Sequence, residues 1–183
     1  MKGTDFGKMR RLLGLLLFGL TLSGIIAGCG YHYIGGEDNI DPGIQKVFVD
    51  SFANKTSQAG IEVLVRNAFI DQILRGGRFQ LAGRRDEADA VIRGSVQSLY
   101  TAPLSYHTTD LAAEARLTIV MDIIFEERAS KKTIWQSRNF SYNGDYPVTS
   151  GSLNATEASR KDALTKLSND VAERAYSLML SGF

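Results

Sequence analysis

Side chains that could support catalysis are few and scattered in this sequence. The 183 residues include one cysteine, Cys29, and two histidines, His32 and His107. A zinc site needs three or four His, Cys or carboxylate ligands at ordered spacing, and the sequence shows no such spacing. Ser105, His107 and Asp110 match a hydrolase triad by type, but three residues so close in one loop rarely face one another as nucleophile, base and orienting acid. The sequence therefore predicts a protein that is not an enzyme and that holds no metal or cofactor.

Cys29 is the residue whose position indicates a covalent modification. It follows a basic start, an apolar run of 11 residues from Leu12 to Leu22, and the small residues Ala27 and Gly28. That run is too short to span a bilayer, which needs about 20 residues, and its flanks are those of a secretory signal. The segment Ile26-Ala27-Gly28-Cys29 resembles the lipobox of bacterial lipoproteins. In such proteins the signal is cut before the cysteine, which then takes a diacylglyceryl thioether and an N-terminal acyl chain such as palmitate.

We therefore predict a signal peptide over residues 1–28 and lipidation at Cys29. Two or more acyl chains anchor a protein stably, whereas a single chain holds it reversibly. Gly30 stands where inner-membrane lipoproteins often carry aspartate, so the expected location is the periplasmic face of the outer membrane. The alternatives are an ordinary secretory signal with a chance cysteine near the cut, or a short uncleaved anchor.

Two pairs of basic residues could contact an anion. Arg84-Arg85 and Lys131-Lys132 both fall in expected turns. The simpler interpretation is solvated turn charge. The alternative is contact with phosphates of a lipid headgroup, because Lys and Arg pair readily with phosphate oxygens.

Composition excludes some classes of partner. Without residues 1–28 the chain has 155 residues, with 17 basic and 19 acidic side chains, because the leader holds four basic residues and one acidic residue. No bulk basic field therefore points to nucleic acid. Residues 29–44 include the Gly- and Pro-containing stretch 34–43 and are expected to form a flexible tether. Residues 45–183 are expected to form one domain.

The first half of that domain has the pattern of a strand, a helix and a new strand. Lys46 to Phe52 is rich in β-branched and aromatic residues, as in a short strand. An amphipathic helix follows and ends at Gly76-Gly77. Its apolar stripe consists of Ile61, Leu64, Val65, Ala68, Phe69 and Ile73. The next apolar run, 78–81, completes a βαβ pattern.

Three longer strands and a second helix are expected in the rest of the chain. Alternating apolar residues predict strands over 90–100, 115–126 and 133–143, with a bulge where the phase slips between Trp135 and Phe140. The strand 115–126 is apolar on one face and mixed on the other, as expected of a sheet that helices cover on one side. Asn154 to Glu157 resembles a capping box for the last helix, which is expected to end at Gly182. The predicted fold is an α/β (α+β) two-layer sandwich, with two helices on one face of a mixed four- to five-stranded sheet.

Several segments, taken in order, resemble the LptE family of lipopolysaccharide-assembly lipoproteins. They are the opening Cys29-Gly30-Tyr31-His32-Tyr33, the helical Leu64-Val65-Arg66-Asn67, the long strand from Glu114 to Glu126, the returning Phe140-Ser141-Tyr142, and the closing helix. The resemblance implies the two-helix sandwich already expected from the residues. It also implies a protein that sits inside an LptD-like β-barrel at the outer membrane, supports barrel assembly and helps to move lipopolysaccharide to the outer leaflet.

The resemblance carries over one functional residue, Cys29. Some family members use basic residues in two loops near the strand ends to contact lipopolysaccharide. Here the loop from Ser105 to Thr109 has only His107, and the loop from Gly151 to Ala155 has no basic residue. The alternative function is that of another outer-membrane lipoprotein that serves as an envelope-assembly or secretion-pore partner.

Overall fold

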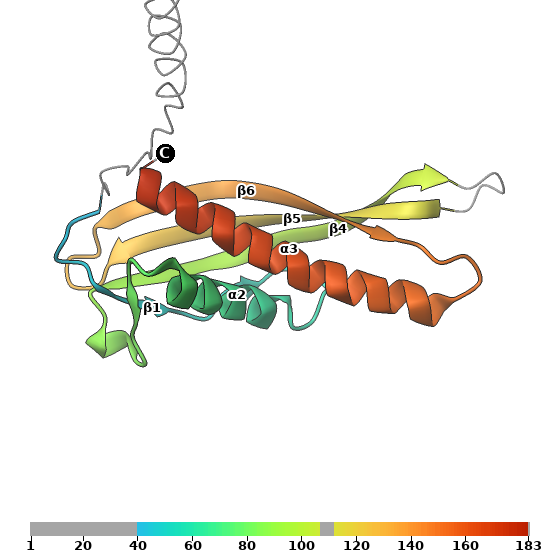
Figure 1. The fold of residues 1–183 in the computed structure, drawn as a ribbon. Coiled ribbons are helices and arrows are strands. Elements are labelled where there is room, and N and C mark those ends of the chain that lie inside the picture. Colours follow the sequence, from blue (N-terminus) through green and yellow to red (C-terminus); the bar gives the residue numbers. More distant parts are fainter. Residues whose placement is uncertain (1–39, 107–111, 183) are drawn as a thin grey trace, which may run out of the picture. The chain divides into compact units, whose positions relative to one another are not determined.

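The computed structural model describes residues 40–106 and 112–182. All of them belong to one unit of the chain, Gly36–Phe183. Its elements follow the chain in this order: β1 (Lys46–Val49), β2 (Ala53–Asn54), α2 (Ile61–Gly76), β3 (Gln80–Leu81), the 3-10 turn η1 (Arg85–Glu87), β4 (Ala90–Tyr106), β5 (Ala112–Glu127), β6 (Thr133–Pro147) and α3 (Leu153–Ser181) (Figure 1).

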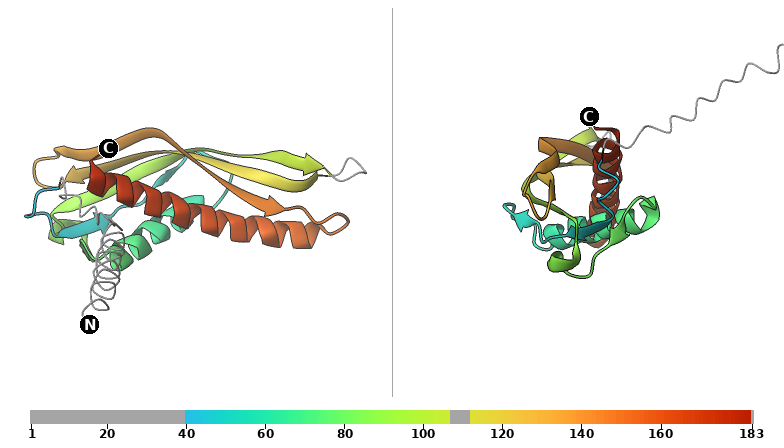
Figure 2. Two further views of the ribbon diagram at one scale, coloured as in Figure 1. Left: turned by 45° about the horizontal axis from the view of Figure 1, so that its top comes forward. Right: turned by 90° about the vertical axis from the view of Figure 1, so that its left-hand side faces the viewer.

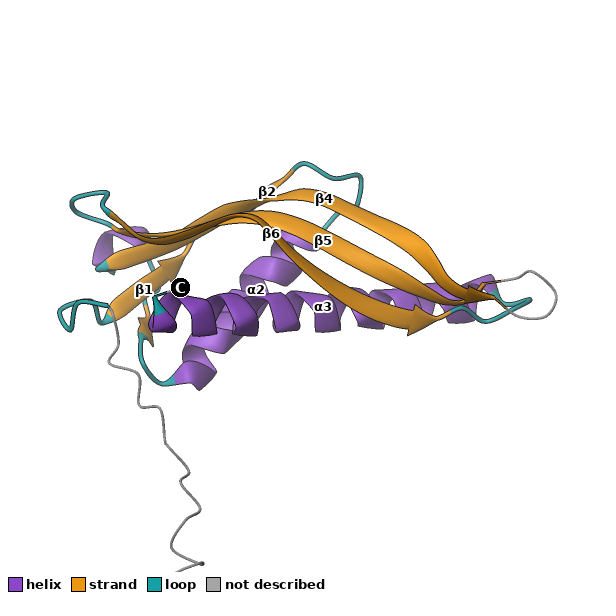
Figure 3. Ribbon diagram, turned by 90° about the horizontal axis from the view of Figure 1, so that it is seen from above, coloured by secondary structure: helices purple, strands orange, loops and turns teal. Residues whose placement is uncertain are grey.

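The strands form one mixed sheet. Its order is β3-β1-β4-β5-β6, and β2 pairs with β4 beside this path (Figure 3). β1 runs parallel to β3 and β4, which confirms the βαβ pattern, whereas β4, β5 and β6 pair antiparallel. The sheet has six strands rather than four or five, because the short segment Ala53–Asn54 adds a parallel pairing with Ser95 and Val96.

Both helices cover the same face of this sheet (Figure 2). The predicted stripe of α2 is buried except for Leu64, which is half-buried. Phe69 of this stripe stacks on Phe52 with ring centroids 5.3 Å apart. Gly77 ends the helix in the left-handed conformation, with φ of 70°, which glycine adopts without steric cost. The two-layer α+β sandwich is thus confirmed.

α3 is capped two residues before the predicted capping box. Its N-cap is Ser152, whose hydroxyl accepts a hydrogen bond from the backbone N–H of Ala155 at 3.3 Å. Asn154 already lies inside the helix, so the prediction of a cap at Asn154 was wrong: the serine supplies the same kind of short acceptor side chain earlier in the chain. Gly182 ends the helix with φ of 75°, as expected. In residues 40–106 and 112–182, no helix is both long and apolar enough to cross a membrane.

The predicted bulge lies on β6. Met121 pairs with Phe140 but Ile123 pairs with Ser137, so β6 holds one residue more than β5 over this interval. Asn139 takes up the extra length with φ of 53°, and its N–H donates to Asp122 Oδ1 at 3.0 Å. The bulge therefore lets Trp135 and Phe140 both pack against the core despite their odd spacing.

The core extends further toward the N-terminus than expected. Ile40 and Ile44, placed in the tether by their sequence context, are 3% and 8% exposed and belong to the hydrophobic core. The start expected near Gln45 was therefore too late, because two isolated isoleucines among turn residues give no periodic pattern. The packed unit therefore includes Ile40 and Ile44.

Candidate interaction surface

The sheet has an open face, opposite α2 and α3 (Figure 3). This open face carries the alternating residues of β4, β5 and β6 that do not point into the core. Val120 and Ile124 are half-buried there, and Thr118 and Glu126 are buried. The face is therefore mixed, as the sequence predicts, and its polar side chains must find partners within it.

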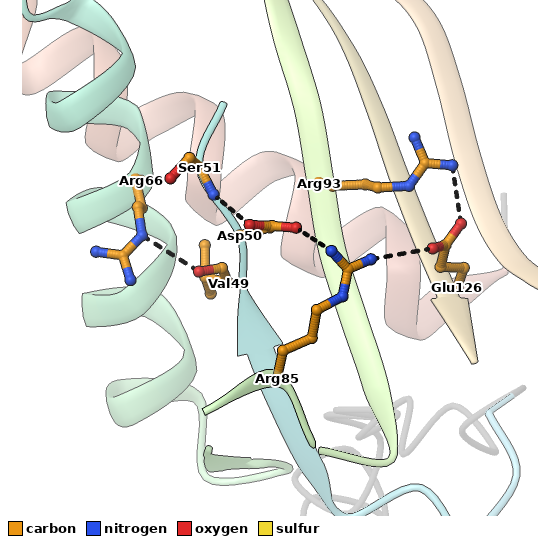
Figure 4. A network of polar contacts seen from close by, with 7 residues as sticks. All are labelled: Val49, Asp50, Ser51, Arg66, Arg85, Arg93 and Glu126. Atoms are coloured by element: carbon orange, nitrogen blue, oxygen red, sulfur yellow. Dashed lines mark hydrogen bonds and ion pairs between the residues drawn. The ribbon is translucent and has the colours of Figure 1, made fainter. Parts of the chain in front are cut away.

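A charged network occupies the open face where β1, β4 and β5 meet (Figure 4). Arg85, from η1, reaches Asp50 Oδ2 at 2.7 Å and Glu126 Oε1 at 3.9 Å. Arg93 on β4 donates to the other oxygen of Glu126 at 2.9 Å. Glu126 is only 5% exposed, so two guanidinium groups compensate a carboxylate that has lost most of its water.

The pairing shifts the acid–base balance of its members. The hydrogen bond from Arg93 lowers the pKa of Glu126, although burial of the carboxylate acts in the opposite direction. The same bond raises the pKa of Arg93. Nearby, Asp89 accepts hydrogen bonds from the backbone N–H groups of Lys46 and Gln45, which lower its pKa. These shifts come from structural pairing, and they keep the paired groups ionised near neutral pH.

In the Glu126→Gln variant, the free energy of unfolding should decrease less at acid pH than it does in the parent. A carboxylate with a lowered folded pKa stabilises the fold fully above its unfolded pKa, about 4.3 for glutamate. That stabilisation is lost as the pH falls through the folded value, so the parent should lose free energy of unfolding between about pH 5 and pH 3. The free energy of unfolding, measured with denaturant at several pH values in this range, should change less steeply with pH for Glu126→Gln than for the parent. Glu157→Gln, which removes an exposed carboxylate of α3, should follow the parent. Identical slopes for the parent and Glu126→Gln would show that the Arg93 pairing does not stabilise the fold.

Further along the open face, polar side chains pair across neighbouring strands. Arg116 on β5 holds Asp145 on β6 through two bonds, Nε to Oδ1 at 2.7 Å and Nη2 to Oδ2 at 2.8 Å. Thr118 donates to the side-chain oxygen of Asn143 at 2.8 Å. Asp122 accepts from Gln97 on β4, besides its bond to the bulge. Charged side chains in this part of the open face are thus paired with side chains of neighbouring strands. A partner would therefore meet polar groups that can form hydrogen bonds, rather than unpaired charges.

The structure separates the four basic residues predicted to contact a headgroup. Arg85 and Lys131 line one open hollow of about 390 Å³, together with Asp86 and Arg128. Arg84 is instead held by its own turn, with Nη2 at 2.9 Å from Glu87 Oε1. Lys132 lines a different hollow of about 270 Å³, which also includes Asp41, Ile44 and Glu127. Headgroup contact by these four residues stays a prediction.

Sequence reasoning missed the partners that make up the charged network. Arg93 and Glu126 stand 33 positions apart, and Arg116 and Asp145 stand 29 apart. One feature of the sequence could have indicated the first pair. Arg93 and Glu126 both alternate with core residues, and they fall at the same end of two strands that pair antiparallel. Arg128, which joins the hollow, directly follows β5 and carried no pattern of its own.

The predicted lipidation site, Cys29, and His107 of the triad match lie outside the described residues. Within the described part of the chain, no group of three or more His, Cys, Asp or Glu residues is placed to hold a metal ion.

Comparisons with known proteins bear on the fold and the family. The family model described as "LptE: Lipopolysaccharide-assembly" matches residues 44–179. No curated protein sequence matches the chain. Among solved structures, a candidate lipoprotein from Caulobacter crescentus CB15 is 16% identical in sequence, with a TM-score of 0.51. The match covers 72% of this chain and 88% of the Caulobacter chain. The uncharacterised lipoprotein B from Nitrosomonas europaea is 11% identical with a TM-score of 0.54, covering 80% and 88%. At these identities the two structures support the two-layer fold alone.

Proposed function

The chain belongs to the LptE family of lipopolysaccharide-assembly proteins, and from this premise we propose that it is an outer-membrane lipoprotein that plugs and supports an LptD-like β-barrel. In that role it assists the transport of lipopolysaccharide to the outer leaflet. The observation that carries the proposal is the family match over residues 44–179, which includes all the strands and nearly all of α3. The family is one of non-catalytic lipoproteins, so the proposed work is docking and support.

The proposed anchor is Cys29. The basic start, the short apolar run and the lipobox-like Ile26-Ala27-Gly28-Cys29 support cleavage before the cysteine and acylation of its thiol and new N-terminus. Such an anchor would hold the packed unit at the periplasmic face of the outer membrane. Gly30, in place of an aspartate, supports outer-membrane sorting.

The open face of the sheet supports docking against a polar wall. The inner surface of an outer-membrane barrel is lined by polar side chains. A face whose charges are already paired suits such a partner. When the two surfaces meet, the paired charges can be buried together, so no unpaired charge is left in the contact. The pairs Arg116–Asp145 and Arg93–Glu126 meet this condition, and Val120 and Ile124 between them add apolar contact.

Affinity purification of the lipidated chain from outer membranes in mild detergent tests the proposal. We expect it to recover a large β-barrel protein. The alternative function, that of another envelope-assembly or secretion-pore partner, predicts a complex without such a barrel and no defect in surface lipopolysaccharide when the protein is depleted.

A further inference from the structure

A cationic hollow lies beside the turn that joins β5 and β6. Arg85, Arg128 and Lys131 line it together with the carboxylate of Asp86, and it measures about 390 Å³. The three cations come from two segments, η1 and the β5–β6 turn, that are far apart in the sequence. We propose that this hollow binds the phosphate of an anionic phospholipid headgroup in the leaflet that holds the anchor.

The three cations differ in how far they are already paired. Arg85 contacts Asp50 and Glu126 on the open face. By contrast, within residues 40–106 and 112–182 neither Arg128 nor Lys131 has a carboxylate within 4.0 Å. Arg128 and Lys131 act on Asp89 and Glu126 only at longer range. Among the described residues the hollow therefore holds two cations without a directly bonded carboxylate, and an anion from outside can pair with them.

The backbone holds these two cations in place. Arg128 donates from Nε to the carbonyl of Ala88, and its backbone N–H donates to Asp89 O at 2.8 Å. The guanidinium is thus fixed at one nitrogen and keeps its two terminal NH₂ groups for an anion. Lys131 has φ of 61°, in the left-handed region, and its N–H donates to Glu127 O at 3.0 Å. This tight turn sets where the lysine side chain leaves the backbone.

The length of the tether allows the hollow to reach a membrane. The same β5–β6 turn, through Glu127 and Lys132, lines the neighbouring hollow with Asp41 and Ile44, so it lies where the chain enters the packed unit. Cys29 precedes Ile40 by 11 residues, and a chain of that length spans at most about 40 Å. A lipid anchor at Cys29, on which this inference rests, would thus keep Ile40, where the chain enters the packed unit, within about 40 Å of the bilayer surface.

Weak binding is enough under these conditions. A short tether raises the effective concentration of the surface to the millimolar range, so two or three cations can orient the unit against the leaflet. Phosphate is the group they suit: arginine pairs with two of its oxygens, and lysine adds a point charge.

Vesicle flotation of the mature chain with Cys29 replaced by serine measures the headgroup contact without the anchor. The described residues, 40–106 and 112–182, enclose their own hydrophobic core, so this unlipidated chain is expected to fold. It should bind phosphatidylglycerol-containing vesicles more tightly than pure phosphatidylcholine vesicles, and salt should weaken the binding. Arg128→Gln and Lys131→Asn should each lower the partition coefficient about fivefold, and the double variant about 25-fold. Asparagine is chosen at position 131 because it tolerates the left-handed backbone.

The matched control is the double variant Arg138→Gln, Lys161→Gln, which removes the same charge from exposed positions on β6 and α3. It should change the partition coefficient less than twofold. Equal losses in both double variants would overturn the proposal, because diffuse net charge would then explain the binding. Binding of millimolar inorganic phosphate to the hollow, without any preference for phosphatidylglycerol vesicles over phosphatidylcholine vesicles, would show a site for free phosphate instead of a headgroup. Recovery of a barrel by the Arg128→Gln, Lys131→Asn variant separates this inference from the proposed function, since barrel docking should be unaffected.

Discussion

Gly94→Ala should destabilise the packed unit by about 3 kcal/mol, at the upper end of the cost of overpacking a core. A Cβ at this position would lie 2.1 Å from the carbonyl oxygen of Asp122 and 2.9 Å from Cε1 of Phe52. The oxygen belongs to the backbone of β5, so it cannot move without shifting the strand. Phe52 in turn stacks on Phe69 of α2. One added methyl group would therefore disturb both the β4–β5 pairing and the contact between sheet and helix.

Gly144→Ala is the matched control for this prediction. It also adds one methyl group to a strand glycine, but the new Cβ would meet the nearest atom, Leu167 Cβ, at an ordinary 3.5 Å. Thermal unfolding of the mature chain, followed by circular dichroism, should show a midpoint lower by about 10 °C for Gly94→Ala. Gly144→Ala should stay close to the parent. Equal midpoints for Gly94→Ala and the parent would show that β4 and β5 do not approach so closely.

Cys29→Ala should abolish lipidation and leave most of the protein unprocessed or soluble. Without the thiol, no thioether forms, and the signal is not cut at this site. The loss should be large because stable anchoring depends on the acyl chains themselves. Intact-mass measurement and membrane fractionation of the full chain would follow both effects.

The comparison for this change is Ser23→Ala, a small substitution in the leader that keeps the cysteine. It should be processed and sorted as the parent is. Unchanged mass and unchanged membrane association of Cys29→Ala would contradict lipidation at this residue and favour an uncleaved anchor or an ordinary signal.

The layers of the fold could be predicted because they depend on local periodicity. The spacing of apolar residues predicts the buried stripe of α2, the core face of β5 and the bulge on β6. The structure confirms all three. The role of Gly94 could not be predicted from local periodicity. It occupies a core-facing position between Ile92 and Val96, and nothing local indicates that Phe52 takes the space of its missing side chain.

The candidate surface was harder to predict because its members meet across strands. Arg85 belongs to a pair that the sequence singled out, but its partners Asp50 and Glu126 lie 35 and 41 positions away. Arg84 and Arg85 are neighbours in the chain, yet one bonds to its own turn and the other to the sheet. The basic pairs could therefore be recognised as turns, whereas the hollow formed by Arg85, Arg128 and Lys131 required the topology that joins η1 to the β5–β6 turn.

Partnership with an outer-membrane β-barrel is the proposed role of this protein. Its most direct test is affinity purification of the full lipidated chain from outer membranes in mild detergent, with Gly144→Ala and Arg128→Gln, Lys131→Asn as folded control variants. We predict that the parent and both controls recover a large β-barrel of the LptD type, in an amount that matches the bait. Recovery of the folded, lipidated chain without any barrel would show that the protein is not a barrel partner.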